Sequence, residues 1–171
     1  MPMFQLGFKC EPLGLGETAV RDEVIGELAA EVLFGESSAL YLRLYEKGLI
    51  DSSFGGGFDT LDGMAMLTAY GDSRDPEKVR DAILKEARQL LRRGIDEETL
   101  LRMKRSAMGR RIRELDGFDS TAFRVCAYYL SGFDYFRFPE IYATVTEKEI
   151  LDFIERAVTK DRCALSIIDP L

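Results

Sequence analysis

The fold is decided by one stretch in the first half of the chain, residues 52–70, which reads SSFGGGFDTLDGMAMLTAY. Three consecutive glycines stand inside a run that otherwise has the character of a strand, and the Asp62-Gly63 pair after them is typical of a turn. We therefore interpret residues 55–62 as the bend of a hairpin. Met64–Tyr70 is apolar at nearly every position, which predicts a strand in the centre of a sheet.

Two further strands are predicted near the ends of the chain. In Met3–Lys9 the apolar side chains occupy alternate positions, which is the period of a half-buried strand. Cys163–Ile168 is the last apolar run and predicts the final strand. The sequence contains no internal repeat and no linker, so residues 1–171 are predicted to form a single domain.

The rest of the chain has helical periodicity, with capping residues at the helix starts. Ser37 or Ser38, Asp75 and Asp96 are typical N-caps, and Thr146 with Glu149 forms a capping box. The order of strand, two helices, two strands, several helices and strand predicts an α+β fold, in which helices cover one face of a mostly antiparallel sheet. The predicted helices span residues 17–35, 38–48, 76–94, 97–115, 121–130 and 147–157.

The predicted helix over residues 97–115 carries an unusual number of basic residues. Acidic residues flank it, and the whole chain has 23 basic and 30 acidic residues, a net charge of −7. This balance favours a solvated helix face over nucleic-acid binding, which stays a third interpretation. The side chains expected to face inward are Leu100, Leu101, Ala107, Met108, Ile112 and Leu115. Those expected largely on the other faces are Arg102, Lys104, Arg105, Arg110, Arg111 and Arg113.

The composition excludes several classes of catalytic site. The chain has no histidine, so a Ser-His-Asp triad, a Cys-His pair and a two-histidine zinc site are all impossible within it. Its three cysteines form no C-x-x-C pair, which indicates a reducing compartment. No run reaches the length of a membrane span and no signal peptide is seen, so we expect a cytoplasmic protein that does not enter a membrane.

The remaining candidate sites are weak. Gly55-Gly56-Gly57 lacks the Lys-Ser/Thr pair of a phosphate-binding loop, so it indicates a bulge or a strand edge that an extended ligand approaches. The acid pair Asp116 and Asp119 is not distinguished from ordinary loop acids, and the aromatic residues between 128 and 138 are typical of a core. No catalytic residue and no metal ligand is predicted in this chain.

Residues 37–51 read SSALYLRLYEKGLID, and they resemble a motif of the insulinase (pitrilysin) family of zinc metallopeptidases. In that family a small-residue helix start leads to a Leu-Arg-Glu-Lys-Gly-Leu-Ala-Tyr sequence. The version found here is similar to a bacterial, processing-peptidase-like subgroup. Other landmarks follow in the family's order: Leu33-Phe34-Gly35 at a helix end, the strand hairpin, the Asp75-Pro76-Glu77 helix start, and Glu97-Glu98 before Lys104.

The resemblance implies a ferredoxin-like metallopeptidase half-domain, of the kind seen in LuxS and processing peptidases. Members of the family enclose a peptide between two homologous halves, and the half with a His-x-x-Glu-His motif supplies the zinc and the catalysis. Because this chain has no histidine, it resembles the C-terminal, substrate-binding half, which cleaves nothing by itself. We expect a fragment of a longer protein, whose zinc lies in a homologous N-terminal half or a paired subunit.

The resemblance also suggests which residues contact the peptide. In the family an arginine and a tyrosine of the motif hold the substrate, but the corresponding positions here are Tyr45 and Asp51, and Arg43 is displaced by two residues. Tyr45 and Asp51 are predicted to contact peptide by motif position, and Phe54 and Gly55 by analogy at the strand edge. The alternative is a catalytically inactive scaffold or protein-interaction module of the same fold.

Overall fold

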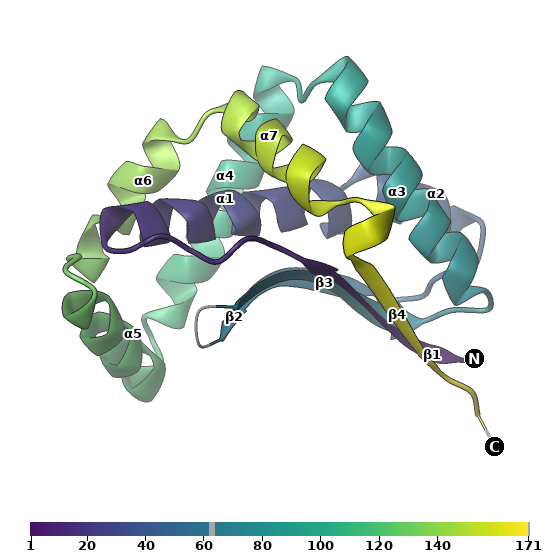
Figure 1. Cartoon of the computed structure of the whole chain (residues 1–171), viewed down its shortest axis with the longest axis horizontal. Coiled ribbons are helices and arrows are strands. Elements are labelled where there is room, and N and C mark those ends of the chain that lie inside the picture. Colours follow the sequence, from purple (N-terminus) through teal and green to yellow (C-terminus); the bar gives the residue numbers. More distant parts are fainter. Residues whose placement is uncertain (62–63, 171) are drawn as a thin grey trace.

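The computed structural model describes residues 1–61 and 64–170, and within them one four-stranded sheet runs beneath a layer of helices (Figure 1). The sheet contains β1 (Met3–Lys9), β2 (Gly55–Leu61), β3 (Met64–Asp72) and β4 (Cys163–Ile168), in the order β2-β3-β1-β4. Every neighbouring pair is antiparallel. The predicted α+β fold, with an antiparallel sheet and helices on one face, is thus confirmed.

The alternation predicted for β1 decides which face of the sheet meets the helices. Phe4, Leu6 and Phe8 are almost completely buried, and each lies opposite a buried position of β3. β3 has a strand on each side, as predicted for a central strand, but Met66 and Tyr70 are exposed on the second face. The sheet is therefore covered on one side only, as antiparallel sheets commonly are.

The prediction of a bend over residues 55–62 is wrong, because Gly55–Leu61 forms a regular strand paired with β3. The glycines serve close packing instead. A Cβ added at Gly56 would lie 2.5 Å from Cδ2 of Phe34 and 2.6 Å from the carbonyl oxygen of Thr68, so only glycine fits between the helix layer and the neighbouring strand. The predicted Asp62-Gly63 turn lies outside the described residues.

The helices follow their predicted caps closely. The side chains of Ser38, Asp75 and Asp96 each accept a hydrogen bond from a backbone N–H in the first turn of the helix that follows. Thr146 and Glu149 form the expected capping box. Two 3₁₀ turns, η1 (Tyr135–Arg137) and η2 (Lys160–Arg162), complete the chain. The helices are α1 (Glu17–Phe34), α2 (Ala39–Glu46), α3 (Pro76–Arg93), α4 (Glu97–Glu114), α5 (Phe118–Leu130), α6 (Phe138–Thr144) and α7 (Glu147–Ala157).

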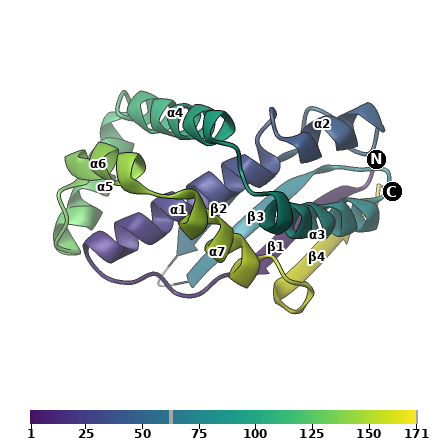
Figure 2. The same cartoon turned by 90° about the horizontal axis from the view of Figure 1, so that it is seen from above.

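Helix α1 forms the centre of the helix layer, with α7 on one side and α4 on the other (Figure 2). Val24, Leu28 and Leu33 have no exposed surface, which places the core between α1 and the sheet. None of the helices in the described part of the chain combines the length and apolar composition needed to cross a bilayer.

The predicted faces of α4 are partly wrong. Leu101 and Ile112 were expected inside but are about half exposed, and Arg111 was expected outside but is only 2% exposed. The buried face runs through Met103, Ala107 and Arg111, at a spacing of four residues. Arg111 points inward because it pairs with Glu23 and Glu27 of α1. The sequence of α4 alone does not reveal this contact.

One ion pair joins the start of α7 to α1 and gives the fold a pH dependence. Arg21 Nε donates to Glu149 Oε1 at 2.7 Å, and Nη2 donates to Oε2 at 3.0 Å. The hydrogen bond from Arg21 lowers the pKa of Glu149 to about 2, against an ordinary value of 4.5. Because the pKa is lower in the folded state, the stabilisation is present above pH 4.5 and is lost as the pH falls towards 2.

We expect Glu149→Gln to lower the free energy of unfolding at pH 7 by about 1–2 kcal/mol, allowing for screening by solvent. The variant should lose less stability than the wild type when the pH falls from 5 to 3, as measured by urea unfolding. Asp152→Asn is the control, because it removes only the exposed Lys148–Asp152 pair within α7. Equal pH slopes for Glu149→Gln and the wild type would contradict the assignment.

Candidate functional site

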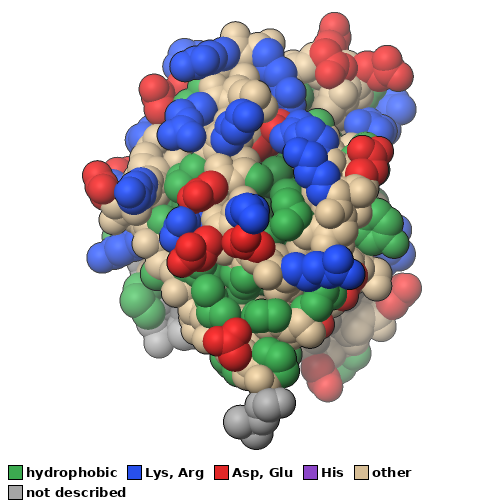
Figure 3. Space-filling view, turned by 90° about the vertical axis from the view of Figure 1, so that its right-hand side faces the viewer, with side chains coloured by type: hydrophobic (Ala, Val, Ile, Leu, Met, Phe, Trp, Pro, Cys, Tyr) green, Lys and Arg blue, Asp and Glu red, His purple; other side chains and the backbone are tan. Residues whose placement is uncertain are grey.

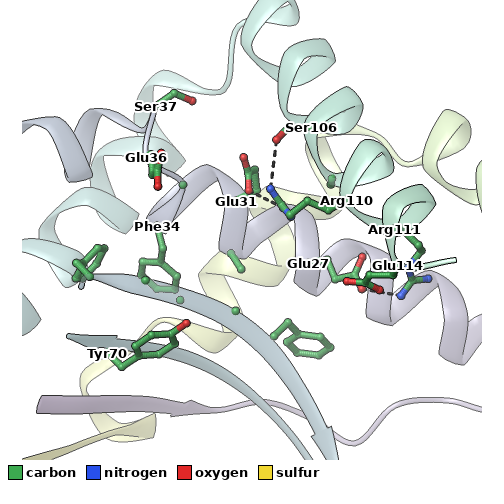
Figure 4. Close-up of a pocket in the computed structure, with 18 of the residues that line it drawn as sticks. Glu27, Glu31, Phe34, Glu36, Ser37, Tyr70, Ser106, Arg110, Arg111 and Glu114 are labelled. Atoms are coloured by element: carbon green, nitrogen blue, oxygen red, sulfur yellow. Dashed lines mark hydrogen bonds and ion pairs between the residues drawn. The ribbon is translucent and has the colours of Figure 1, made fainter. Parts of the chain in front are cut away.

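A cavity opens beside the free edge of β2 (Figure 4). Within the described residues β2 pairs only with β3, so the backbone groups on its other edge have no strand partner. The cavity has a volume of about 710 Å³ and lies between this edge, α1 and α4. It is lined from β2 by residues 55–58, from α1 by Glu27, Glu31 and Phe34, and from α4 by Ser106, Arg110 and Arg111.

A second cavity continues the first along β2. It has a volume of about 460 Å³ and lies between residues 58–60 of β2, Glu23 and Glu27 of α1, and the side of α5 that carries Phe123, Arg124 and Tyr128. The two cavities share Glu27 and Phe58, so they form one channel beside the strand. We call this channel the edge groove.

The glycines leave the backbone of β2 accessible from the edge groove. Gly55, Gly56 and Gly57 all line the groove. A Cβ added at Gly57 would have no described atom within 4 Å, apart from those of its own chain neighbours. An unpaired strand edge offers a row of N–H and C=O groups, and the absence of side chains removes the steric barrier to pairing. The groove can therefore accept an extended chain as an additional strand.

A buried ionic cluster forms the wall of the groove opposite β2. Arg111 Nη2 lies 2.7 Å from Glu23 Oε1 and 2.6 Å from Glu27 Oε1. The hydroxyl of Tyr128 donates to Glu23, and that of Tyr142 donates to Glu27. These five side chains, which we call the Arg111 cluster, join α1 to α4, α5 and α6, and so fix the position of the outer wall.

The pKa values in the Arg111 cluster follow from burial and from the close charges. Burial raises the pKa of Glu27 and outweighs the opposing effect of Arg111. Burial and the carboxylate of Glu23 raise the pKa of Tyr128, and burial and Glu27 raise that of Tyr142. Burial lowers the pKa of Arg111 while Glu27 and Glu23 raise it, with a net increase. The guanidinium therefore stays charged at any physiological pH.

A second arginine neutralises the next carboxylate of α1. Arg110 Nη2 lies 2.6 Å from Glu31 Oε2, and Arg110 Nη1 donates to Ser106 Oγ at 3.2 Å (Figure 4). Arg110 is 45% exposed, so this pair lies at the mouth of the groove, whereas Arg111 lies inside. Each groove-facing carboxylate of α1 is thus matched by an arginine of α4.

The residues of this chain do not fit a zinc site. The groove-facing donors of α1 are Glu27 and Glu31, and arginines occupy both. Among residues 1–61 and 64–170, no group of three or more His, Cys, Asp or Glu side chains is placed to hold a metal ion. A zinc ligand set normally includes histidine or cysteine, and the sequence has no histidine. The chemistry that these residues support is the binding of an extended chain.

Two of the four predicted contact residues lie at the groove. Phe54 and Gly55 both line it. The ring of Phe54 is 5% exposed and packs against Phe4, Phe34 and Tyr41, so its main role is in the core beneath the strand edge. Gly55 begins β2 and contributes backbone only.

Tyr45 and Asp51 lie away from the edge groove. The ring of Tyr45 stacks on Tyr41 at 5.8 Å and is 53% exposed on α2. Asp51 accepts hydrogen bonds from the N–H and the hydroxyl of Ser53 in the turn before β2. Arg43 pairs with the buried carboxylate of Glu86 on α3, again outside the groove. Contact of Tyr45 and Asp51 with a peptide stays a prediction.

The side of the molecule that carries α3 and both termini has a mixed charge (Figure 3). Lys and Arg side chains gather over its upper part with acidic side chains among them, and hydrophobic side chains lie below, towards the sheet. Lys78 pairs with Asp75, and Arg93 with Glu86. The basic residues of this side are therefore partly neutralised by neighbours, as in an ordinary solvated surface.

The sequence matches a known protein family and a known protein. Residues 1–107 match the family described as the peptidase M16 inactive domain. The chain is 27% identical over 172 residues to the uncharacterized zinc protease YmfH of Bacillus subtilis (strain 168), covering 99% of this chain and 40% of that protein. The chain therefore spans about two fifths of the length of this relative.

Solved structures give the same fold. A presumed M16-like peptidase from Alicyclobacillus acidocaldarius superposes with a TM-score of 0.86 at 22% identity, over 97% of this chain and 40% of that one. The inactive peptidase domain of a presumed zinc protease from Bordetella parapertussis superposes with a TM-score of 0.79 at 16% identity, over 100% of this chain and 91% of that one. The predicted family resemblance is confirmed.

Proposed function

Because this chain belongs to the family of peptidase M16 inactive domains, we propose that it forms the non-catalytic wall of a peptide-binding chamber. The edge groove carries this proposal. A homologous N-terminal half or a paired subunit with a His-x-x-Glu-His motif holds the zinc and performs the cleavage. The two parts together enclose the peptide, and the three free cysteines support a reducing, cytoplasmic setting.

In this proposal the peptide lies against β2 as an additional strand. Hydrogen bonds between main chains supply most of the affinity, so the site accepts many sequences. Alternate peptide side chains point towards α1 and α4, where Arg110 and Arg111 are already paired with Glu31 and Glu27. Because these charges neutralise one another, the wall selects weakly for peptide charge.

Ser106→Trp is expected to weaken peptide binding about tenfold or more. The side chain of Ser106 is exposed on α4 and lines the larger cavity, so an indole at this position fills the groove without entering the core. The measurement is fluorescence anisotropy with labelled 12-residue peptides of random sequence. The substitution should leave the unfolding midpoint in urea nearly unchanged.

Ser52→Trp is the matched control, because Ser52 is exposed in the turn before β2 and does not line the groove. It should bind the peptides as the wild type does. Peptide binding that is equally strong in all three proteins would place the binding surface elsewhere. Absence of peptide binding in the wild type would favour the alternative of an inactive scaffold.

A further inference from the structure

One face of α5 is turned towards β2 across the second cavity of the edge groove. The residues of α5 and its C-cap that line this cavity recur every three or four positions, which is the spacing of one helix face. Residues 58–60 of β2 line the same cavity. The helix face consists of Ser120, Phe123, Arg124, Ala127, Tyr128 and Ser131.

The polar side chains on this helix face already have partners. Arg124 Nη2 lies 3.0 Å from Glu114 Oε2, and the hydroxyl of Tyr128 donates to a carboxylate of α1. The hydroxyls of Ser120 and Ser131 donate to nearby backbone carbonyls at 3.0 and 2.8 Å. An apolar ligand can therefore enter the cavity without leaving these groups unpaired.

Phe123 stands on the same face with most of its ring uncovered. It is 75% exposed, whereas Phe34 and Phe54, which line the first cavity, are 3% and 5% exposed. Ala127 follows one turn later and is too small to cover the ring. From the strand side, the partly buried ring of Phe58 lines both cavities. The second cavity is therefore the part of the groove where a ligand can cover an exposed aromatic ring.

The alternation of β2 determines which peptide side chains reach this cavity. Gly56 points to the helix layer, because a Cβ added there would lie 2.5 Å from the ring of Phe34. Phe58 points the same way, because its Cγ would lie 2.5 Å from a Cβ added at Gly26 of α1. Directly opposite residues of two paired strands share one face of the sheet. The peptide side chain opposite Phe58 therefore points to the second cavity, and the one opposite Gly56 points to the first.

We infer that Phe123 and Phe58 form a subsite for one aromatic side chain of the peptide, an inference that rests on the proposed function. The aromatic side chain enters from β2 and covers the exposed ring of Phe123, so that apolar surface of both partners leaves the water. Aromatic pairs add a further gain to that burial. The main-chain contacts with β2 stay independent of sequence, so the groove selects one peptide position and tolerates variation at the others.

A basic side chain gains little in the same place. Arg111 at 2.7 Å and Arg124 at 3.8 Å neutralise Glu23, and Arg111 also pairs with Glu27. Asp59 belongs to the alternate positions of β2, which point to the other face of the sheet, and its carboxylate accepts a hydrogen bond there. The charges that line the cavity are thus already balanced, and an aromatic ring is the occupant that its chemistry favours.

The experiment uses one labelled 12-residue host peptide of serine and threonine that carries Phe, Lys or Ser at its sixth position. Because the host is otherwise uniform, the peptide can adopt the register that places this side chain best. In fluorescence anisotropy the Phe peptide should bind the wild type about tenfold more tightly than the Ser peptide. The Lys peptide should bind about as the Ser peptide does.

Substitutions on α5 assign the preference to the subsite. Phe123→Ser should remove the difference between the Phe and Ser peptides and leave binding of the Ser peptide unchanged, whereas Phe123→Tyr, which keeps the ring, should retain most of the difference. Phe118→Ser is the matched control, because Phe118 is 84% exposed on the same helix and does not line the groove. Both positions are exposed, so the unfolding midpoints in urea should stay at the wild-type value.

The outcomes separate this inference from the proposed function. Equal binding of the Phe and Ser peptides by the wild type would overturn the subsite and leave the proposed function intact. A preference that survives Phe123→Ser but not Phe118→Ser would also overturn the subsite, as would a Lys peptide that binds more tightly than the Phe peptide. If none of the three peptides binds the wild type, the proposed function fails and the subsite fails with it.

Discussion

Replacing Arg111 with leucine is expected to lower the free energy of unfolding by about 3–5 kcal/mol, the largest loss we predict for a side chain outside the apolar core. The substitution removes the buried guanidinium from between two largely buried carboxylates, so that Glu27 loses its arginine and Glu23 keeps only the more distant Arg124, at 3.8 Å. In a domain of this size the midpoint of thermal unfolding should fall by about 10 °C. Circular dichroism during heating measures the effect.

The loss should depend on pH. Burial already raises the pKa of Glu27 above its ordinary value. The protonated carboxyl therefore stabilises the folded state at pH values below the ordinary pKa, and this stabilisation is lost as the pH rises through the raised pKa. Without Arg111 the cost of the charged form increases. The Arg111→Leu variant should therefore be less destabilised at pH 5 than at pH 8.

The neighbouring arginine is a matched control. Arg110 is 45% exposed and pairs with Glu31 at the groove mouth, so Arg110→Leu should cost no more than about 1 kcal/mol. Similar losses for the two variants would show that the Arg111 cluster is not a buried electrostatic unit. Binding of peptides by Arg110→Leu should stay close to that of the wild type, because β2 supplies the main-chain contacts.

Gly56→Val is expected to destabilise the protein by about 2–4 kcal/mol. The new Cβ would lie 2.5 Å from the ring of Phe34 and 2.6 Å from the carbonyl oxygen of Thr68, and the second of these atoms cannot move without breaking the pairing of β2 with β3. Urea unfolding gives the free energy. Where the variant does not accumulate in soluble form, limited proteolysis of the refolded protein reports the same loss.

The adjacent glycine supplies the comparison for Gly56→Val. A Cβ at Gly57 meets open space among the described atoms, so Gly57→Val should change the stability by less than about 1 kcal/mol, and in the stabilising direction. If Gly57→Val lost as much stability as Gly56→Val, close packing around Gly56 would not explain the loss.

The regular elements were predictable because local residues determine them. Ser38, Asp75 and Asp96 cap helices by hydrogen bonds that span three residues, and the alternation in Met3–Lys9 reports directly which side chains face the core. The strand Gly55–Leu61 was not predicted, because three consecutive glycines give the segment a low strand propensity. Only the ring of Phe34, from a distant helix, explains why Gly56 belongs there.

The groove was not predictable in the same way, since three elements far apart in sequence form it. Glu27 lies 84 residues from Arg111, and no local pattern brings them together. The repeated glutamates at 23, 27 and 31 on one helix were the available signal, because a row of acids beside an apolar face requires cations from a neighbouring element. The family resemblance led to the prediction of Phe54 and Gly55 as contact residues at the strand edge, and it gave no information on the opposite wall.

The pairing of β1 with β4 has a consequence for biosynthesis. Phe8 lies opposite Cys163, so β1, which is synthesised first, can pair with β4 only after more than 150 further residues have been made. Until then the outer edge of β1 is open to other nascent chains, and closure of the sheet is among the slow steps that long sequence separation imposes. Closure of the sheet therefore cannot precede the synthesis of residues 163–168, and a chaperone that shields the outer edge of β1 until then would protect the chain from mispairing.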